Sequence, residues 1–342
     1  MQQKMAQLSK AAAVLCLLGC LAVAGAFAQT DGELTAKVRL FSGIGPGLRA
    51  VRRGADGRTY VLASPSPGLV AFDKQGKQSL AITEAASAGA TGDKPGRTGI
   101  SFGEDFDLDA DGRLYVADRG LNAIQVFSPD GAWLRSVGVT APLSVASIGE
   151  GEIAVATLRE PHLVVVFDKN GRNVREFGDP EPISERQDLN RFLNVGELAA
   201  DAQNHLYYGF SYMPEPTVRQ YDRNGYGAGP DVQYLALEAA SKAQAIRREI
   251  VQQEKRHKAP AFKRVLTGLG IDRTNGEIWM AVGNTLVHFD KEGTRRASYQ
   301  IYTPEGARLE ATTLLVDSDR LIIGGDPIGL YQFDRPDKKI KP

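Results

Sequence analysis

The four histidines of this chain, His162, His205, His257 and His288, are the residues that a transition-metal centre would use first. No two of them share the spacing of metal ligands, so the sequence does not support a zinc or copper enzyme. It also contains no Gly-x-Ser-x-Gly nucleophile, phosphate-binding loop or dinucleotide motif, and the glycine-rich run at 43–47 lacks the strand and helix that such a motif requires. The sequence therefore predicts no catalytic residue and no metal or other cofactor.

A second group of polar residues could bind an anion. Arg119 and Arg159 each follow a short apolar run, and Tyr212 follows a third run of the same kind. Two guanidinium groups beside a ring of hydrogen-bond acceptors can hold a carboxylate or a sulfate. The alternative, which we favour at this stage, is that each arginine braces a neighbouring unit through Asp118 or Glu160. The candidate ligand-binding residues are Asp118, Arg119, Asn122, Arg159, Glu160, His162, Tyr212, Asn284 and Asp326.

Short strands must position these residues, as the stretch 106–138 indicates. It contains four apolar runs separated by Asp-Gly turns and one polar loop. This pattern is typical of strands joined by hairpins, and it predicts one four-stranded antiparallel sheet. Such a sheet cannot bury both of its faces alone, so a chain that repeats it is expected to stack the copies around shared cores.

Degraded copies of this unit recur along nearly the whole chain. The clearest landmark is an aromatic residue followed by a small polar or acidic residue at the expected end of each third strand. It occurs six times, at Phe72, Phe127, Phe167, Tyr221, Phe289 and Phe333. The spacings are 55, 40, 54, 68 and 44 residues, and repeats of about forty to fifty residues with four strands each are propeller blades. The sequence predicts an all-β, six-bladed β-propeller over residues 35–337.

The two ends of the chain predict how this ring closes. The sixth copy ends in RPDKKIKP without a fourth strand, while the segment 37–43, before the first copy, resembles a fourth strand. We expect the N-terminal strand to complete the last blade, because this pairing removes an exposed sheet edge.

The stretch 106–138 resembles the NHL repeat of six-bladed β-propellers. The likeness is carried by LYVADR at 114–119, followed by Asn122 and the run IQVF at 124–127. The third, fourth and fifth copies keep VVVFDKNG, QYDRNG and HFDKEG, so the resemblance extends at motif level over about 35–337. The NHL family includes protein-binding modules, a copper- and zinc-dependent lyase branch, and relatives among sugar-lactone hydrolases. The resemblance therefore implies the fold but does not choose a reaction.

Two functions remain open under this resemblance. The first is a binding module for a protein or another ligand, which we favour. The alternative is a divalent-cation-dependent hydrolase or lyase of the lactonase-like or amidating-lyase-like type. The three-histidine site of the lyase branch is not matched. The lactone-hydrolase relatives hold a cation such as Ca²⁺ with carboxylate and amide oxygens, and the corresponding candidates here are Asp118, Asn122, Glu160, Asn284 and Asp326.

Three long segments interrupt the copies, at 79–101, 179–195 and 230–266. Each is expected between a fourth strand and the next first strand, so all three should crowd one mouth of the ring. Loops on a rigid scaffold are common binding sites, although such connections also simply tolerate insertions. The expected partner is a protein, or an anionic small molecule or glycan, bound at this face.

The third insertion predicts a helix at about 235–259. Ala243, Ile246 and Ile250 continue an apolar stripe at three- and four-residue steps. Eight basic residues lie between 236 and 264 against three glutamates. One hypothesis is that this helix forms a lid over the mouth and binds an acidic partner or an anionic glycan. The alternative is an ordinary solvated helix face with ion pairs.

Residues 1–28 match a secretory signal. Lys4 and Lys10 precede an apolar run that ends in Ala-Phe-Ala at 26–28. Lipidation at Cys20 and an uncleaved anchor are the alternatives. Both cysteines of the chain lie in this segment, so the processed chain can form no disulfide of its own. The predicted location is secreted or periplasmic, with no transmembrane domain after cleavage.

The net charge of the chain argues against a nucleic-acid partner. The chain has 41 basic and 41 acidic residues, and removing the leader leaves 39 basic residues against 41 acidic ones. Nucleic-acid binding needs a basic surface, so no nucleic-acid partner is expected.

Overall fold

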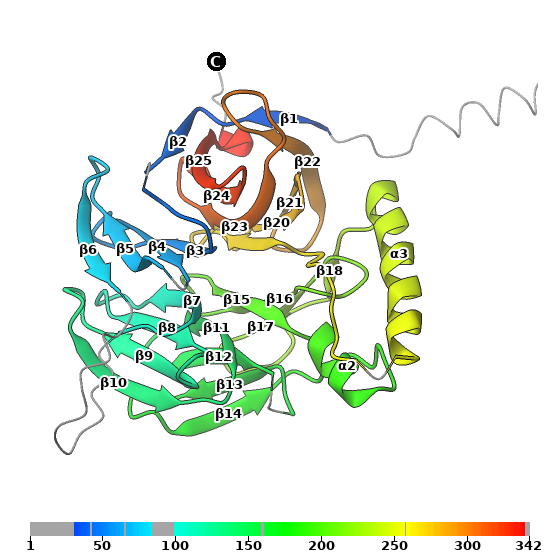
Figure 1. The fold of residues 1–342 in the computed structure, drawn as a ribbon, viewed down its shortest axis with the longest axis horizontal. Coiled ribbons are helices and arrows are strands. Elements are labelled where there is room, and N and C mark those ends of the chain that lie inside the picture. The colour runs from blue at the N-terminus through cyan, green and yellow to red at the C-terminus, as the bar shows by residue number, and fades with distance from the viewer. Residues whose placement is uncertain are drawn as a thin grey trace, which may run out of the picture.

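The computed structural model describes residues 31–41, 43–64, 66–83, 99–158, 161–256 and 258–338. Within them the strands form six mainly antiparallel sheets that stand as blades around a central axis (Figure 1). The predicted all-β, six-bladed β-propeller is confirmed. The leader predicted at 1–28 lies outside the described residues, as do Arg159, Glu160 and His257.

Each blade runs from a first strand near the axis to a fourth strand at the rim. Blade 1 contains β3 (Leu48–Arg53), β4 (Thr59–Ala63), β5 (Gly68–Phe72) and β6 (Gln78–Ile82). Blade 2 contains β7 (Gly103–Leu108), β8 (Leu114–Asp118), β9 (Ala123–Phe127) and β10 (Trp133–Gly138). Blade 3 contains β11 (Pro142–Ser147), β12 (Ile153–Thr157), β13 (Val164–Phe167) and β14 (Asn173–Phe177).

The second half of the ring follows the same plan. Blade 4 contains β15 (Gly196–Ala200), β16 (Leu206–Phe210), β17 (Thr217–Tyr221) and β18 (Val232–Gln233). Blade 5 contains β19 (Gly268–Ile271), β20 (Ile278–Val282), β21 (Thr285–Phe289) and β22 (Arg295–Tyr302). Blade 6 contains β23 (Glu310–Val316), β24 (Arg320–Asp326) and β25 (Gly329–Asp334).

The six landmark aromatic residues have a common structural role. Each lies at the end of the third strand of its blade, or one residue before it in blade 6, and is buried in the apolar cluster between that blade and the one before it. Phe127, for example, packs with Tyr60 and Phe106 between blades 1 and 2, and Phe333 packs with Trp279 between blades 5 and 6. Large aromatic side chains contribute much of the apolar area buried in such an interface. The repeated aromatic residue in the sequence therefore corresponds to a repeated packing contact between neighbouring blades.

The turns between first and second strands depend on aspartates. In blade 2, the Asp109 carboxylate accepts hydrogen bonds from the Arg113 amide at 2.8 Å and from the Tyr115 hydroxyl at 3.0 Å, and Gly112 takes a positive φ of 79°. Asp-Gly turns favour this geometry because glycine adopts a positive φ without strain. Burial, with the adjacent Asp109 carboxylate, raises the pKa of Tyr115 to about 12. The carboxylate is therefore part of the turn.

Ring closure follows the sequence prediction and adds a strand that the sequence did not predict. β2 (Val38–Leu40) pairs antiparallel with β25 and completes blade 6. Just before it, β1 (Gly32–Thr35) pairs in parallel with β22 as a fifth strand on blade 5. Phe41 then stacks on Phe72 of blade 1, with ring centroids 4.0 Å apart. The N-terminal segment thus contacts three consecutive blades.

Two helices lie in the insertions. α3 (Leu237–Glu254) is the helix predicted in the third insertion, and α2 (Gln187–Leu193) was not predicted. They pack together through Leu189, Leu193 and Ile250. Figure 1 shows α3 beside the ring, so it does not cover the centre as the lid hypothesis required. The predicted insertions also begin too early, because β6 and β18 extend into them. None of the helices in the described part of the chain has the length and apolarity that a membrane crossing needs.

Candidate functional site

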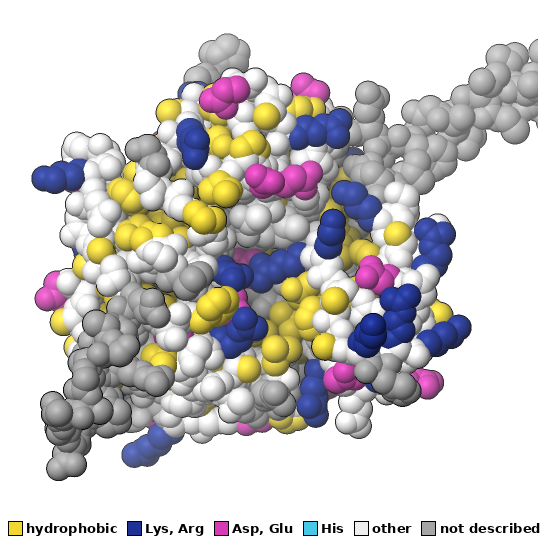
Figure 2. All heavy atoms as spheres, in the orientation of Figure 1, with side chains coloured by type: hydrophobic (Ala, Val, Ile, Leu, Met, Phe, Trp, Pro, Cys, Tyr) yellow, Lys and Arg dark blue, Asp and Glu magenta, His cyan; other side chains and the backbone are white. Residues whose placement is uncertain are grey.

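A cavity of about 260 Å³, here called the mouth pocket, opens at the axis on the side of the ring that carries the insertions. It is formed by the starts of the first strands of blades 1 to 4, by residues that follow second strands, and by residues from the second and third insertions. Figure 2 shows basic side chains gathered around a hollow at the centre of this face. Its lining consists of Arg49, Glu104, Asp105, Arg119, Leu143, Ser144, Leu158, Phe192, Val195, Gly196, Glu197, Ser211, Tyr212 and Arg264.

Two arginines of the mouth pocket share one carboxylate. Arg49 of β3 and Arg119, just after β8, lie 3.3 Å and 2.9 Å from the oxygens of Glu104. Both guanidinium groups also lie over the Phe102 ring, at 5.2 Å and 5.0 Å from its centroid. One negative charge thus faces two positive charges, and the side chain of Arg119 remains 44% exposed. This side of the pocket can accept a further anionic group.

Two β-bulges place the charged residues at this rim. The register of β3 against β4 shifts between Leu48 and Ala50, and that of β7 against β8 shifts between Gly103 and Asp105. Arg49 and Glu104 are the extra residues at these equivalent positions of neighbouring blades. A bulge re-aims the side chain of the extra residue, which explains why two residues of sheet strands line the mouth.

The opposite wall combines a third arginine with aromatic rings. Arg264, from the end of the third insertion, lies beside Tyr212 and Glu197. The Tyr212 ring packs on Phe192 of α2 with centroids 4.5 Å apart. The insertions therefore contribute a flat apolar surface next to a positive charge, which suits a ligand with both an anionic and an apolar part.

Glu197 is a group of the mouth pocket whose pKa lies near neutral pH. Burial and the nearby Asp105 carboxylate raise the pKa of Glu197 to about 7, against the opposing effect of Arg52 and Arg264. A carboxyl group that is half protonated near pH 7 can accept or donate a proton under ordinary conditions. It also changes the charge of the pocket when it titrates.

An ion pair closes the floor of the mouth pocket. Arg52 of β3 lies 2.9 Å from Asp105 of β7, and Asp105 also accepts hydrogen bonds from the Ser144 hydroxyl and the amides of Phe106 and Val145. Burial raises the pKa of Asp105, while Arg52 acts in the opposite direction. Beyond this pair, a second cavity of about 570 Å³ opens to the other face. The axis therefore holds two separate cavities.

The structure places the predicted site residues in different environments. Arg119 and Tyr212 line the mouth pocket. Asp118 is buried and accepts hydrogen bonds from the amides of Ser101 and Phe102, and Asn122 accepts one from the amide of Ala141. These contacts hold loops in place.

The other candidates do not line the mouth pocket. His162 faces Asp179 at 3.7 Å. The amide of Asn284 donates to Gln300 at 2.6 Å in blade 5. Asp326 ends β24 and is exposed. Arg159 and Glu160 lie outside the described residues.

Sequence reasoning missed most of the charged residues that the structure brings together, namely Arg49, Glu104, Asp105, Glu197 and Arg264. One signal was present for four of them. They lie in first strands, which line the axis of a propeller, and charged residues are unusual in buried strands. Arg264 gave no such signal, because its position depends on the path of the third insertion.

Metal binding at the mouth pocket is not supported by ligand geometry in the described part of the chain. Its three carboxylates, those of Glu104, Asp105 and Glu197, do not each offer an oxygen that lies within 4.8 Å of the other two. Each also lies close to an arginine. The Ca²⁺ of the alternative function stays a prediction.

No protein-family model matches this sequence, and no curated protein matches it. Solved structures do resemble it. A streptogramin B lyase shares 11% identity at a TM-score of 0.53, covering 87% of this chain and 86% of that one. A catalytically inactive virginiamycin B lyase from Staphylococcus aureus, solved with quinupristin, shares 10% identity at a TM-score of 0.53. The match covers 86% of this chain and 83% of that one. Hydrazine synthase of Kuenenia stuttgartiensis shares 8% identity at a TM-score of 0.52, and the match covers 88% of this chain and 98% of that one. At these identities the likeness concerns the propeller fold alone.

Proposed function

We propose that this chain is a binding module of NHL type whose mouth pocket holds the carboxylate or sulfate group of a small molecule, a glycan or a protein segment. The observation that carries the proposal is the convergence of Arg49 and Arg119, from two blades, and Arg264, from the third insertion, on one cavity. Arginine forks suit planar or tetrahedral anions, and Tyr212 and Phe192 offer an apolar surface beside them. The 1–28 segment supports export, so we place this binding outside the cytoplasm.

The first test is binding of simple anions to the full-length chain. Sulfate and glucuronate are the probes, with glucose as the neutral control, and isothermal titration calorimetry is the measurement. Arg119→Ala should weaken binding of both anions about tenfold or more, because a charge-assisted hydrogen bond contributes about 1.5–3 kcal/mol. Arg223→Ala is the matched control, since Arg223 is exposed and pairs with Glu150 away from the pocket. Unchanged anion binding in Arg119→Ala, with lower stability, would instead assign Arg119 to bracing.

The second test uses pH. Glu197 is protonated below its pKa of about 7 and negatively charged above it. A charged Glu197 repels a bound anion, so affinity for sulfate should fall severalfold as the pH rises from about 6 to about 8. Arg52 and Arg264 keep their charge over this range, and sulfate stays a dianion. Glu197→Gln should bind sulfate with the same affinity at both pH values. An equally steep dependence in Glu197→Gln would exclude Glu197 as the cause.

The alternative function, a hydrolase or lyase, has one observation in its favour. A carboxyl group with a pKa of about 7 is suited to act as a general base. If Ca²⁺ raises the melting temperature of the chain and Glu197→Gln abolishes that rise, the enzyme is favoured, because only a ligand of the folded state stabilises it. The binding-module proposal expects no shift with Ca²⁺.

A further inference from the structure

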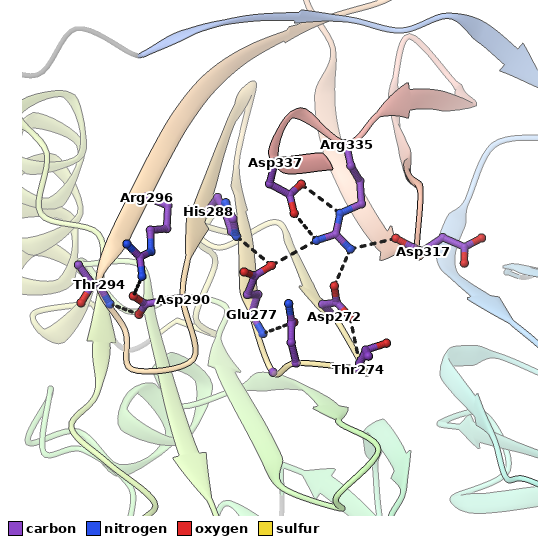
Figure 3. Close-up of polar contacts among 12 residues, drawn as sticks. Asp272, Thr274, Glu277, His288, Asp290, Thr294, Arg296, Asp317, Arg335 and Asp337 are labelled. Carbon is purple, nitrogen blue, oxygen red and sulfur yellow. Dashed lines mark hydrogen bonds and ion pairs between the residues drawn. The ribbon is translucent and has the colours of Figure 1, made fainter. Parts of the chain in front are cut away.

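A second cluster of chemically capable side chains lies where the C-terminal segment meets blade 5. Glu277 comes just before β20, His288 is in β21, and Asp337 is in the 3-10 turn η1 (Pro336–Lys338). One ligand atom of each residue lies within 4.8 Å of the other two. Figure 3 shows the three side chains pointing toward one another beside Arg335. β20 and β21 are paired strands of blade 5, so Glu277 and His288 lie close together, and the turn that follows β25 brings Asp337 to them.

His288 places a buried ring nitrogen at the cluster. Its side chain is 6% exposed, and its ring stacks on Trp279 with centroids 4.1 Å apart at 9°. Nε2 is buried and makes no hydrogen bond, although it lies 3.3 Å from an oxygen of Glu277. Imidazole nitrogen is a common ligand of metal ions in proteins.

Three carboxylates share one arginine at the cluster. Arg335, whose side chain is fully buried, pairs with Asp272 at 2.6 Å, Glu277 at 3.2 Å and Asp337 at 2.6 Å. One guanidinium charge thus faces three carboxylates, and a divalent cation bound beside them would add positive charge where negative charge is concentrated.

The distance between two of the ligand atoms fits a four-coordinate metal. Zinc binds imidazole nitrogen and carboxylate oxygen at about 2.0–2.2 Å with tetrahedral angles, which places two ligand atoms about 3.3–3.5 Å apart. The distance from His288 Nε2 to the Glu277 oxygen is 3.3 Å. Each carboxylate oxygen has two lone pairs, so Arg335 can keep its hydrogen bonds and hold the ligands from outside.

We propose that Glu277, His288 and Asp337 form a structural site for Zn²⁺, with water as the fourth ligand. The ion would tie the C-terminal segment of blade 6 to blade 5, at the same seam that β1 and β2 close. This site is separate from the mouth pocket, and the proposal does not depend on ligand binding there.

The test is zinc binding to the full-length chain after treatment with a chelator and its removal. Calorimetry should give one Zn²⁺ per chain, and Zn²⁺ should raise the melting temperature by a few degrees. His288→Gln should weaken Zn²⁺ binding at least tenfold and remove the shift. His205→Gln is the matched control, since His205 is a more exposed histidine 2.9 Å from Asp201, and it should bind Zn²⁺ like the original chain.

Two further measurements keep the test decisive. Co²⁺ bound to the original chain should give the intense visible absorption of a four-coordinate site, which needs no variant that could misfold. Asp337→Asn, in the short η1 turn, should also weaken Zn²⁺ binding. The proposal is overturned if the original chain binds no Zn²⁺, or if folded His288→Gln binds it as tightly as the original chain does.

Discussion

Replacing Arg335 with methionine is expected to lower the free energy of unfolding by about 3–5 kcal/mol. Arg335 follows the last strand of the ring, and its side chain is completely buried. Its guanidinium pairs with three carboxylates and donates to the Asp317 carbonyl at 3.1 Å. Methionine would leave these acids without their cation, and Asp272 is 7% exposed and cannot regain solvent. Urea denaturation near pH 7 with a chelator present measures the loss without any contribution from metal.

The control for this substitution is Arg223→Met. Arg223 also pairs with a carboxylate, that of Glu150, but both side chains are exposed. Exposed pairs contribute about 0–1 kcal/mol, so the unfolding free energy should barely change. A loss below about 1 kcal/mol in Arg335→Met would mean that the three acids become protonated or solvated without Arg335, and that the seam between blades 5 and 6 does not depend on it.

Shortening the N-terminus should have an even larger effect, in two steps. A chain that begins at residue 37 lacks β1 with its buried Leu34, and also lacks the buried Ala36 that follows β1. Its free energy of unfolding should fall by about 2–5 kcal/mol. A chain that begins at residue 43 also lacks β2 and Phe41, which leaves β25 as an open edge in blade 6. This chain should show no cooperative unfolding transition and should aggregate, because an open edge strand pairs with other chains.

The reference for both truncations is a chain that begins at Asp31, which keeps β1 and β2. Circular dichroism melts and size-exclusion chromatography distinguish the three chains. If the chain beginning at residue 43 melts cooperatively as a monomer, blade 6 is stable with three strands and closure by β2 is dispensable.

The fold could be predicted because each copy of the repeat carries short sequence patterns that can be recognised without knowing the tertiary structure. Asp-Gly or Asn-Gly turns occur in the first five copies, and an aromatic residue near the end of the third strand occurs in all six. Each landmark aromatic residue packs against the preceding blade. β1 and α2 left no comparable signal. β1 is four residues long and depends on a parallel partner at the rim of blade 5. α2 has seven residues and no side-chain cap at Arg186, so its stability comes from packing against α3.

The candidate site was harder to predict than the fold, because its residues come from separate blades. Arg119 and Tyr212 were found because they follow second strands, and the sequence pattern shows where those strands end. Arg49 and Glu104 reach the mouth through bulges, which the apolar pattern does not reveal. The titration of Glu197 depends on Asp105, Arg52 and Arg264, and these neighbours are defined only when the ring has closed.

The position of β1 and β2 has a consequence for how the molecule is made. Both strands precede all six blades along the chain, yet their partners, β22 and β25, belong to the last two blades. Residues 32–40 must therefore stay unpaired until blades 5 and 6 have been synthesised. Folding of the native ring can only be completed once β25 has left the ribosome, which leaves the nascent chain a long interval in which a chaperone or a translocation machinery can engage it.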